Sequence, residues 1–384
     1  MSSTPMTNPL LRLGRLTLSP ELRTLQPGSA GSGLVVTATV GVPDSSSEPQ
    51  HAWDVAWDDA VREAGQSGAD PGTAQALAAG AGDALVGGTR VVVAAHGRVL
   101  LARWLAPGAA VNSVRVGPLP HLQEVAAGAA RRPAYVVVQA ERDGTDIAAH
   151  VSGDEQPPVP FSVGSRPGLS SDPDPGRPPA QLHGERHVTD REPESGGQRN
   201  DAFIAGRVAE AAASVGAHIV LGTGDRHILD AVGAHLPDSV GPIVAIADST
   251  DGPGLSAAIG TALDRVTTEA GRAVADMVAS RAEGPEPAAV RGIKPVAEQL
   301  AEQQVAVLLV AADLAGEAGS TYRIGSSPTE FVVDDPDIGV EVPLEDGLVW
   351  AALHQDAIVV QVPGRSGPLG GEAAAALLRR GSAT

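Results

Sequence analysis

The sequence predicts an α/β protein of three domains, in each of which helices pack on a small mixed sheet. The chain has 384 residues, more than one hydrophobic core usually organises. Short β-branched runs alternate with segments of helical periodicity along most of its length. A charge pair and a proline at Arg131-Arg132-Pro133, and a long helical stretch beginning near Leu255, divide the chain into residues 1–132, 133–250 and 251–384.

The composition limits both the cores and the chemistry. Hydrophobic residues make up 42% of the chain but aromatic residues only 2%, so the cores are expected to be built from Ala, Val, Leu and Ile. The chain has no cysteine, which excludes disulfides, thiolate catalysis and Cys-ligated zinc. It has neither a signal peptide nor an apolar run of roughly 20 residues, so we expect a soluble cytoplasmic protein.

The formal net charge of −19 argues against a general nucleic-acid coat, because affinity for phosphate needs clustered Lys and Arg. Two possibilities stay open at this charge. One is a local basic patch on a single loop, and the other is an acidic domain that docks a protein partner.

The first domain is predicted to combine helices with an antiparallel hairpin. A helix over His51–Glu63 places Trp53, Trp57 and Val61 at i, i+4 and i+8 on one face. At this spacing we interpret the two tryptophans as core packing rather than as a base-stacking platform. The other expected elements are a strand at Leu34–Val40, a helix at Thr73–Val86, and strands at Arg90–Ala95 and Arg98–Leu105 joined by a turn at His96-Gly97.

The middle domain is predicted to alternate strands and helices around one long loop. The loop, Gly153–Gln181, is rich in Pro, Gly and Asp and has no periodicity, which is typical of a functional or a disordered segment. The expected elements are strands at Ala134–Ala140 and Asp146–Val151, a helix at Asn200–Val215, a strand at His218–Leu221, a turn at Gly222-Thr223-Gly224, a short helix to Leu236 and a strand at Ile243–Ala247.

The last domain begins with a linking helix of nearly thirty residues, from Leu255 to about Glu283, on which apolar residues recur at helical spacing. The elements expected after it are a helix at Val296–Gln303, a strand at Val305–Ala311, a loop at Tyr322–Gly325, a helix at Leu348–His354, a strand at Ala357–Val362 and a short closing helix to Arg380.

Few motifs in the chain indicate enzyme chemistry. It contains no Walker loop and no GxSxG elbow, and we interpret Gly222-Thr223-Gly224 as a structural turn rather than a phosphate loop. His183 and His187 flank Glu185 at a metal-like spacing, but they lie in a polar loop, so we predict no metal and no cofactor. The tripeptide Gly196-Gly197-Gln198 stands out, because two glycines at a loop end allow the backbone to pass close to another molecule.

Several apolar segments carry a resemblance to a known family. They are Arg131 to Val138 with Asp143-Gly144 and Asp146-Ile147, Ile219 to Gly222, Val305 to Val310, the end of the chain from Gly370-Gly371 to Arg380, and Arg90 to Trp104. On these residues the chain resembles the bacterial branch of the archaeal and eukaryotic class-one release factor and Pelota superfamily. The closest likeness is to actinobacterial relatives of the ribosome hibernation factor Balon.

The resemblance implies a three-domain, release-factor-like molecule that enters the ribosomal A site. The first domain would face the decoding centre, the middle domain would point a loop toward the peptidyl-transferase centre, and the last would meet a translational GTPase, with elongation factor Tu as the expected partner. Gly196 and Gly197 would supply the backbone conformation, and Gln198 would orient the water that attacks the peptidyl-tRNA ester. The chain departs from release factors in lacking a NIKS-like stop-codon motif and in continuing from the tripeptide with Arg199-Asn200-Asp201.

The resulting hypothesis is a protein that binds the A site of 70S ribosomes and keeps them inactive under stress. The alternatives are a codon-independent peptidyl-tRNA hydrolase acting through Gln198 and an acidic stress protein that does not contact ribosomes. The predicted rRNA-binding loop contains Arg186, His187, Arg191, Gly196, Gly197, Gln198 and Arg199. Acidic residues interleave with these, so a self-neutralising solvated loop is the alternative interpretation of the same stretch.

Overall fold

The computed structural model describes most of the chain as two compact units. The described residues are 8–26, 33–41, 47–84, 88–105, 112–141, 144–151, 159–164, 193–246, 252–282, 288–312, 314, 322–325, 331–333, 339–364 and 369–379. By their contacts, Met1–Arg12 and Pro133–Val266 form the first unit, and Leu13–Arg132 and Thr267–Thr384 form the second. The predicted division into three domains stays a prediction.

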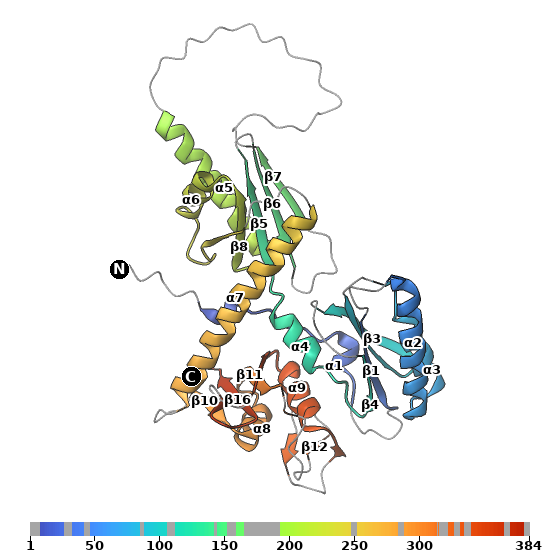
Figure 1. The fold of residues 1–384 in the computed structure, drawn as a ribbon. Helices are drawn as coiled ribbons and strands as arrows, with labels where there is room; N and C mark the ends of the chain where they lie inside the picture. Colours follow the sequence, from blue (N-terminus) through green and yellow to red (C-terminus); the bar gives the residue numbers. More distant parts are fainter. Residues whose placement is uncertain are drawn as a thin grey trace. The chain divides into compact units, whose positions relative to one another are not determined.

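The first unit is built on a mixed sheet with helices on both faces (Figure 1). Its strand order is β7-β6-β5-β8-β9, in which β5, β8 and β9 are parallel and the β5–β6 and β6–β7 pairs are antiparallel. The elements are β5 (Tyr135–Ala140), β6 (Gly144–His150), β7 (Val159–Gly164), α5 (Pro193–Val215), β8 (Ile219–Gly224), α6 (Arg226–Gly233), β9 (Ile243–Ala245) and the first part of α7 (Gly252–Arg281).

The near-continuous apolar run of β5 follows from this layering. Val136 and Val138 join the core under α5 and α6, whereas Tyr135 and Val137 join the core under α7. Both faces of the strand are therefore buried, and a strand buried on both faces is apolar at successive positions rather than at alternate ones.

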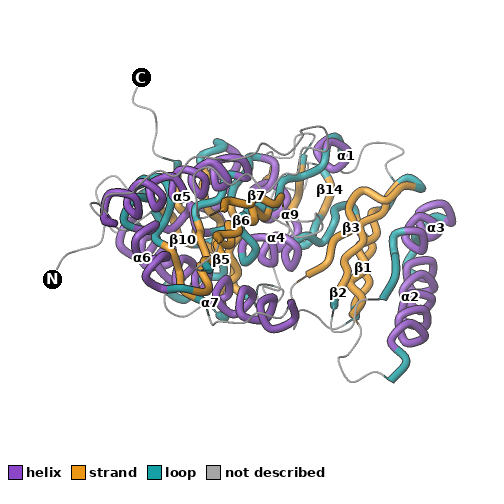
Figure 2. The backbone as a smooth tube through the Cα atoms, turned by 90° about the horizontal axis from the view of Figure 1, so that it is seen from above, coloured by secondary structure: helices purple, strands orange, loops and turns teal. Residues whose placement is uncertain are grey.

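The second unit contains an antiparallel sheet in the order β3-β2-β1-β4, covered on one face by two helices that lie side by side (Figure 2). Trp53 and Trp57 are 1% and 4% exposed in the core beneath these helices, which confirms that they are core residues. The elements are β1 (Val35–Gly41), α2 (Pro49–Gln66), α3 (Pro71–Ala79), β2 (Thr89–Ala95), β3 (Arg98–Leu105) and β4 (Ser113–Gly117).

A second sheet of this unit has the order β10-β16-β11-β15, and a small sheet has the order β13-β12-β14. The buried helix α9 (Leu344–His354) contributes every residue from Leu344 to Leu353 to the interior. The other elements are β10 (Ala289–Arg291), α8 (Ile293–Ala301), β11 (Val305–Ala311), β12 (Tyr322–Ile324), β13 (Phe331–Val333), β14 (Val340–Glu341), β15 (Ile358–Val362) and β16 (Ala374–Leu378).

One apolar cluster joins the two parts of the second unit. It contains Leu22 of α1 (Pro20–Arg23) and Val125 of α4 (Gln123–Ala130), together with Leu308, Trp350 and Val359 from the last part of the chain. The same cluster includes Val91 and Val93 from the face of β2 opposite α2 and α3. Leu13–Arg132 and Thr267–Thr384 therefore share a core although they are far apart in sequence.

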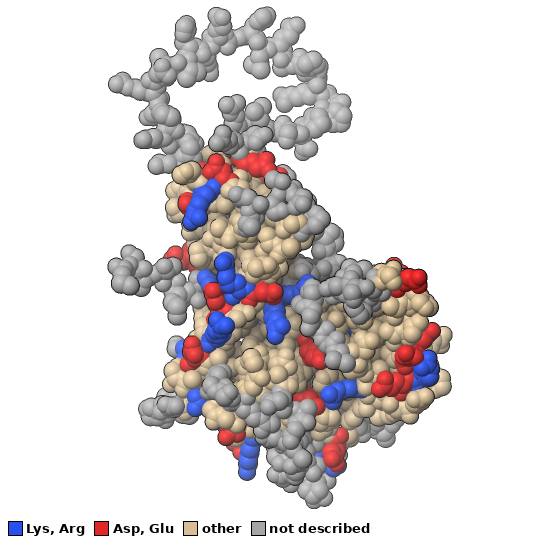
Figure 3. Space-filling view, viewed as in Figure 1, with Lys and Arg blue, Asp and Glu red and all other residues tan. Residues whose placement is uncertain are grey.

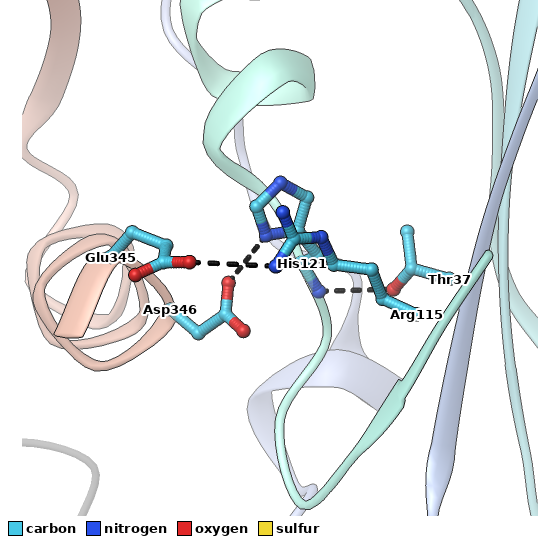
Figure 4. Close-up of polar contacts among 5 residues, drawn as sticks. All are labelled: Thr37, Arg115, His121, Glu345 and Asp346. Atoms are coloured by element: carbon cyan, nitrogen blue, oxygen red, sulfur yellow. Dashed lines mark hydrogen bonds and ion pairs between the residues drawn. The ribbon is translucent and has the colours of Figure 1, made fainter. Parts of the chain in front are cut away.

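Polar contacts also join these two parts of the second unit, at the first turn of α9 (Figure 4). Nδ1 of His121 lies 2.6 Å from Oδ1 of Asp346, and Nη1 of Arg115 lies 3.5 Å from Oε1 of Glu345. The backbone N–H of His121 donates to Oγ1 of Thr37 at 3.0 Å. The side chains of Asp346 and Glu345 are only 6% and 8% exposed, so each buried carboxylate has a basic partner. We call Arg115, His121, Glu345 and Asp346 the α9 seam.

Several predicted elements are confirmed, and their first and last residues agree with the prediction or nearly agree. Strands β3 and β11 have the predicted bounds, and the predicted helix of nearly thirty residues is α7, which has 30. The elements β4 and α4 were not predicted, and the predicted helix at Thr73–Val86 ends at Ala79. None of the helices in the described part of the chain is long and apolar enough to cross a membrane.

The predicted closing helix to Arg380 is wrong, because this stretch is strand β16. Ala374, Ala375 and Ala376 are completely buried, and the strand lies between β10 and β11, antiparallel to both. Alanine favours helices in isolation, but here the strand pairing satisfies the backbone of a segment enclosed on both sides. Tertiary context therefore overrides the local propensity.

Two predicted loops of the chain contain strands. The loop predicted at Gly153–Gln181 contains β7, which lies at the sheet edge, where Pro160 is tolerated. The loop predicted at Tyr322–Gly325 contains β12. The predicted turn at Gly222-Thr223-Gly224 is likewise wrong, because these residues are the end of β8. A Cβ on Gly222 would lie 2.6 Å from Cγ2 of Ile243, so the glycine allows close packing rather than a turn.

Candidate functional site

The tripeptide Gly196-Gly197-Gln198 lies in the first two turns of helix α5. The prediction that it ends a loop and that the helix begins at Asn200 is therefore wrong, since α5 begins at Pro193. Proline is well suited to the first helical position, and an acidic residue such as Glu194 is favourable in the first turn. Each glycine lowers intrinsic helix propensity by about 1 kcal/mol relative to alanine, which explains why the sequence pattern resembles a loop.

The structure describes only part of the predicted rRNA-binding loop. Arg186, His187 and Arg191 lie outside the described residues, as does the His183–Glu185–His187 spacing that was considered for a metal. Gly196, Gly197, Gln198 and Arg199 all lie on the α5 backbone. The roles assigned to these residues stay predictions.

The buried face of α5 holds the helix against the sheet. Ile204, Val208 and Ala211 are at most 1% exposed and recur at helical spacing, and they share a core with Val136 and Ile147 of β5 and β6. The predicted contact residues from Gly196 to Arg199 therefore belong to a helix anchored by a continuous apolar stripe. A site on an anchored helix is positioned more precisely than one on a free loop.

The opposite face of α5 carries Phe203, which is 55% exposed. One turn later, Arg207 forms an ion pair with Glu210 on the same helix. The predicted site omitted Phe203. Its place four residues after Arg199, outside the apolar stripe of Ile204 and Val208, is the signal in the sequence that could have identified it.

The other face of the same sheet has a small open cavity beside β9 and α7. Its volume is about 240 Å³, and Ala245, Ile246, Ala262, Thr261 and Arg265 contribute to its wall. Among the described residues of the wall, which are otherwise mainly apolar, Arg265 is the one ionisable residue, so they form no acid–base pair. Among the residues that the structure describes, no group of His, Asp and Glu is arranged to hold a metal ion.

A family model matches the part of the chain that contains these features. Residues 134–284 match bacterial archaeo-eukaryotic release factor family 2, a segment that runs from β5 to the end of α7 and includes the tripeptide and Phe203. Over this segment the chain is similar to the bacterial branch of the archaeal and eukaryotic release factors, as the sequence predicted. The closer likeness to relatives of Balon stays a prediction.

Solved structures of the superfamily align with much of the chain at low scores. Pelota from Archaeoglobus fulgidus aligns at 15% identity over 76% of this chain and 79% of its own, with a TM-score of 0.35. The yeast S. cerevisiae Dom34 aligns at 10% identity over 73% of each chain, with a TM-score of 0.36. The archaeal translation termination factor aRF1 aligns at 14% identity over 94% of this chain and 95% of its own, with a TM-score of 0.20. No curated protein matches the sequence.

Proposed function

We propose that this protein binds ribosomes, occupies the A site and keeps the ribosome inactive, as a cytoplasmic protein acting under stress. The observation that carries the proposal is the match of residues 134–284 to a release factor family, because this segment includes α5 and the tripeptide at its start. The anchoring of α5 on the sheet supports it further, since a protein that inserts one end of a domain into a narrow site needs that end held rigidly.

The proposal assigns a role to each part of the chain. Residues 1–132 would face the decoding centre, and residues 133–250 would point the start of α5 toward the peptidyl-transferase centre. Residues 251–384 would contact a translational GTPase, with elongation factor Tu as the first one to test. Contacts to rRNA would come from Arg186, His187, Arg191 and Arg199 around the tripeptide.

The electrostatics of the chain make this proposal testable by salt. With a net charge of −19, the protein as a whole is repelled by RNA, so binding must depend on a few local arginines. We expect the protein to cosediment with vacant 70S ribosomes and to dissociate as salt rises. A variant with Arg186, Arg191 and Arg199 changed to Ala should lose binding.

Arg272→Ala is the matched control. Arg272 is an exposed arginine on α7 of the second unit, within residues 251–384, to which the proposal gives no contact with RNA. Its loss should leave cosedimentation unchanged. If the wild-type protein does not cosediment at low salt, with or without elongation factor Tu, the proposed function is wrong.

A second candidate function is codon-independent hydrolysis of peptidyl-tRNA. The observation that favours it is the presence of Gly196-Gly197-Gln198 within the family-matched segment, at the start of α5. Gln198 would orient a water whose oxygen attacks the ester carbonyl. The products would be a free peptide and a tRNA with its 3′ hydroxyl restored.

The two functions separate when peptide release is measured on the same ribosomes. Gln198→Ala should retain ribosome binding under both proposals, but it should abolish release only if the protein is a hydrolase. Binding without release by the wild-type protein would leave A-site occupancy as the function. Release that Gln198→Ala does not change would exclude Gln198 as the residue that orients the water.

A further inference from the structure

Phe203 presents an aromatic ring on the solvent side of α5. It is 55% exposed, whereas its neighbours Ile204 and Ala205 are each 1% exposed. Because successive helical residues are turned by about 100°, Phe203 lies on the side of α5 away from the sheet. The ring thus faces outward from a helix whose other side is fixed in the core.

Basic residues occupy the positions one turn before and one turn after this ring. Arg199 precedes Phe203 by four residues and Arg207 follows it by four, so all three lie along one stripe of the helix. Asp201, the acidic residue nearest in sequence, is turned about 160° away from Phe203 around the helix. Glu210, the ion-pair partner of Arg207, follows Phe203 by seven residues and so lies on the same stripe about two turns away.

At Gly206, one turn after the ring, the described part of the helix surface is open. Gly206 lies three residues after Phe203, and a Cβ built on it meets nothing within 4 Å. Apart from Phe203, the large apolar side chains exposed in the described part of the chain are Leu11, Leu34, Val55 and Val99, none of which is on α5. Among the residues whose side chains are described, Phe203 is therefore a single accessible ring rather than part of a broad apolar patch of the kind that docks a protein.

We propose that Phe203 stacks on an unpaired base of ribosomal RNA, with Arg207 contacting an adjacent phosphate. This proposal rests on the proposed ribosome binding and extends the RNA contact along α5, beyond the residues around the tripeptide. A flat base needs one accessible ring face, and a neighbouring guanidinium group adds cation–π and phosphate attraction. Figure 3 shows acidic and basic side chains intermixed over the visible described face, so such a contact must be local.

Substitution of the ring tests the stacking directly. Phe203→Ala is expected to weaken binding to vacant 70S ribosomes roughly 5- to 150-fold, the range found for loss of one base–aromatic stack. Phe203→Leu keeps an apolar side chain but no ring, so it should weaken binding similarly, whereas Phe203→Trp should bind at least as tightly as the wild-type protein. Because the ring is more than half exposed, these variants should keep the wild-type circular dichroism and melting temperature.

The control is Lys294→Ala, which removes a long exposed side chain from α8, in the part of the chain that the proposed function places against a GTPase. It should bind as the wild-type protein does. If Phe203→Ala and Phe203→Leu both bind ribosomes as tightly as the wild-type protein, Phe203 makes no stacking contact and the inference is wrong, while the proposed function stands. A wild-type protein that does not bind ribosomes at all would instead overturn the proposed function, and this inference with it.

Photo-crosslinking identifies what the ring touches. The full chain with p-benzoylphenylalanine at position 203, bound to 70S ribosomes, should crosslink to ribosomal RNA at an unpaired nucleotide. Crosslinks to ribosomal protein alone would show that the exposed ring faces a protein and would overturn the assignment to a base.

Discussion

Asp346 is a buried carboxylate whose partner comes from the other part of the second unit. Its side chain is 6% exposed and lies 2.6 Å from Nδ1 of His121, which is itself 11% exposed. Removing one member of a buried pair leaves the other without its partner in an environment that solvates charge poorly. Loss of one member of the α9 seam should therefore cost more stability than loss of one member of an exposed ion pair.

The corresponding prediction concerns the loss of this carboxylate. Asp346→Ala should lower the free energy of unfolding by about 1–3 kcal/mol, because it leaves Nδ1 of His121 without its hydrogen-bond partner, measured by urea denaturation of the second unit's transition. The control is Asp59→Ala, which removes an exposed pair with Arg62 and should cost at most about 1 kcal/mol. Equal effects of the two variants would show that the seam is energetically no different from a surface pair.

His354 gives a prediction about pH. Burial lowers the pKa of its imidazole, chiefly because the charged form loses its hydration. Since the pKa is lower in the folded state, the unfolded chain takes up the proton first as the pH falls. The stability from neutral His354 is therefore complete above the ordinary histidine pKa of 6.5 and is lost as the pH falls from there toward the folded pKa.

The measurement is the urea midpoint at about pH 7.5 and about pH 5. His354→Asn should show a smaller fall between the two than the wild-type protein, because the asparagine cannot take up a proton. His51→Asn, at an exposed position on α2, should keep the wild-type fall. A wild-type pH dependence in His354→Asn would assign the effect to other groups.

Asp70 affects stability in a different pH range. Its pKa is lowered mainly by hydrogen bonding to Thr73, so its contribution to stability is lost only as the pH falls below 3.8.

At the scale of elements, two glycines of the first unit differ sharply in what surrounds them. Gly224 ends β8 with φ +94°, and a Cβ there would lie 2.1 Å from the carbonyl oxygen of Ala140. Gly206 lies within α5, and a Cβ there would meet nothing within 4 Å. One glycine is required by a close backbone approach, and the other is not.

Alanine at these two positions should therefore have opposite effects. Gly224→Ala should destabilise the first unit by at least about 1–3 kcal/mol, because both the backbone conformation and the contact with Ala140 become strained. Gly206→Ala should stabilise it by up to about 1 kcal/mol through higher helix propensity. Thermal unfolding of each variant measures the difference, and a destabilising Gly206→Ala would mean that this surface is less open than described.

The elements show why part of the fold could be predicted from the sequence. Strand β11 is a continuous run of apolar residues, and α7 carries apolar residues at helical spacing, so the positions of both follow from local sequence. Strand β16 could not be predicted in this way, since its alanines become a strand only through pairing with β10 and β11. Similarly, β12 is only three residues long and is defined by its pairing with β13 and β14.

The candidate site was predictable in composition but not in conformation. The tripeptide and the arginines around it are visible in the sequence, but the start of α5 at Pro193 was obscured by two glycines that disfavour a helix. The exposure of Phe203 depends on which face of α5 packs on β5 and β6. The packing of Ile204 and Val208 on the sheet determines this face, so the exposure of Phe203 could be recognised only once the packing was known.

At the scale of the whole molecule, the grouping of the chain into two units predicts two unfolding transitions. Leu122→Ala removes a side chain that is 1% exposed from the core shared by Leu13–Arg132 and Thr267–Thr384, and it should lower only the second unit's stability, by about 2–5 kcal/mol. Ile204→Ala is the matched control, because this residue is equally buried in the first unit and should affect only that transition.

Hydrogen exchange measures these effects separately. In the Leu122→Ala variant, the backbone amides of β2 and β11 should lose protection from exchange together, although more than half of the chain separates these strands in sequence. Loss of protection in β2 alone would contradict the shared core, since it would mean that the two parts of the second unit unfold independently.

The shared core of the second unit also determines when it can form during synthesis. Val91, Val93 and Val125 leave the ribosome early, but they pack in one cluster with Trp350 and Val359, which are made near the end of the chain. At the usual rates of translation, the stretch from Arg131 to Ala357 takes roughly 10–45 s to synthesise. During that time the apolar face of the early sheet lacks its later neighbours, so this sheet depends on the nascent chain staying soluble, or on a chaperone, until the last strands arrive.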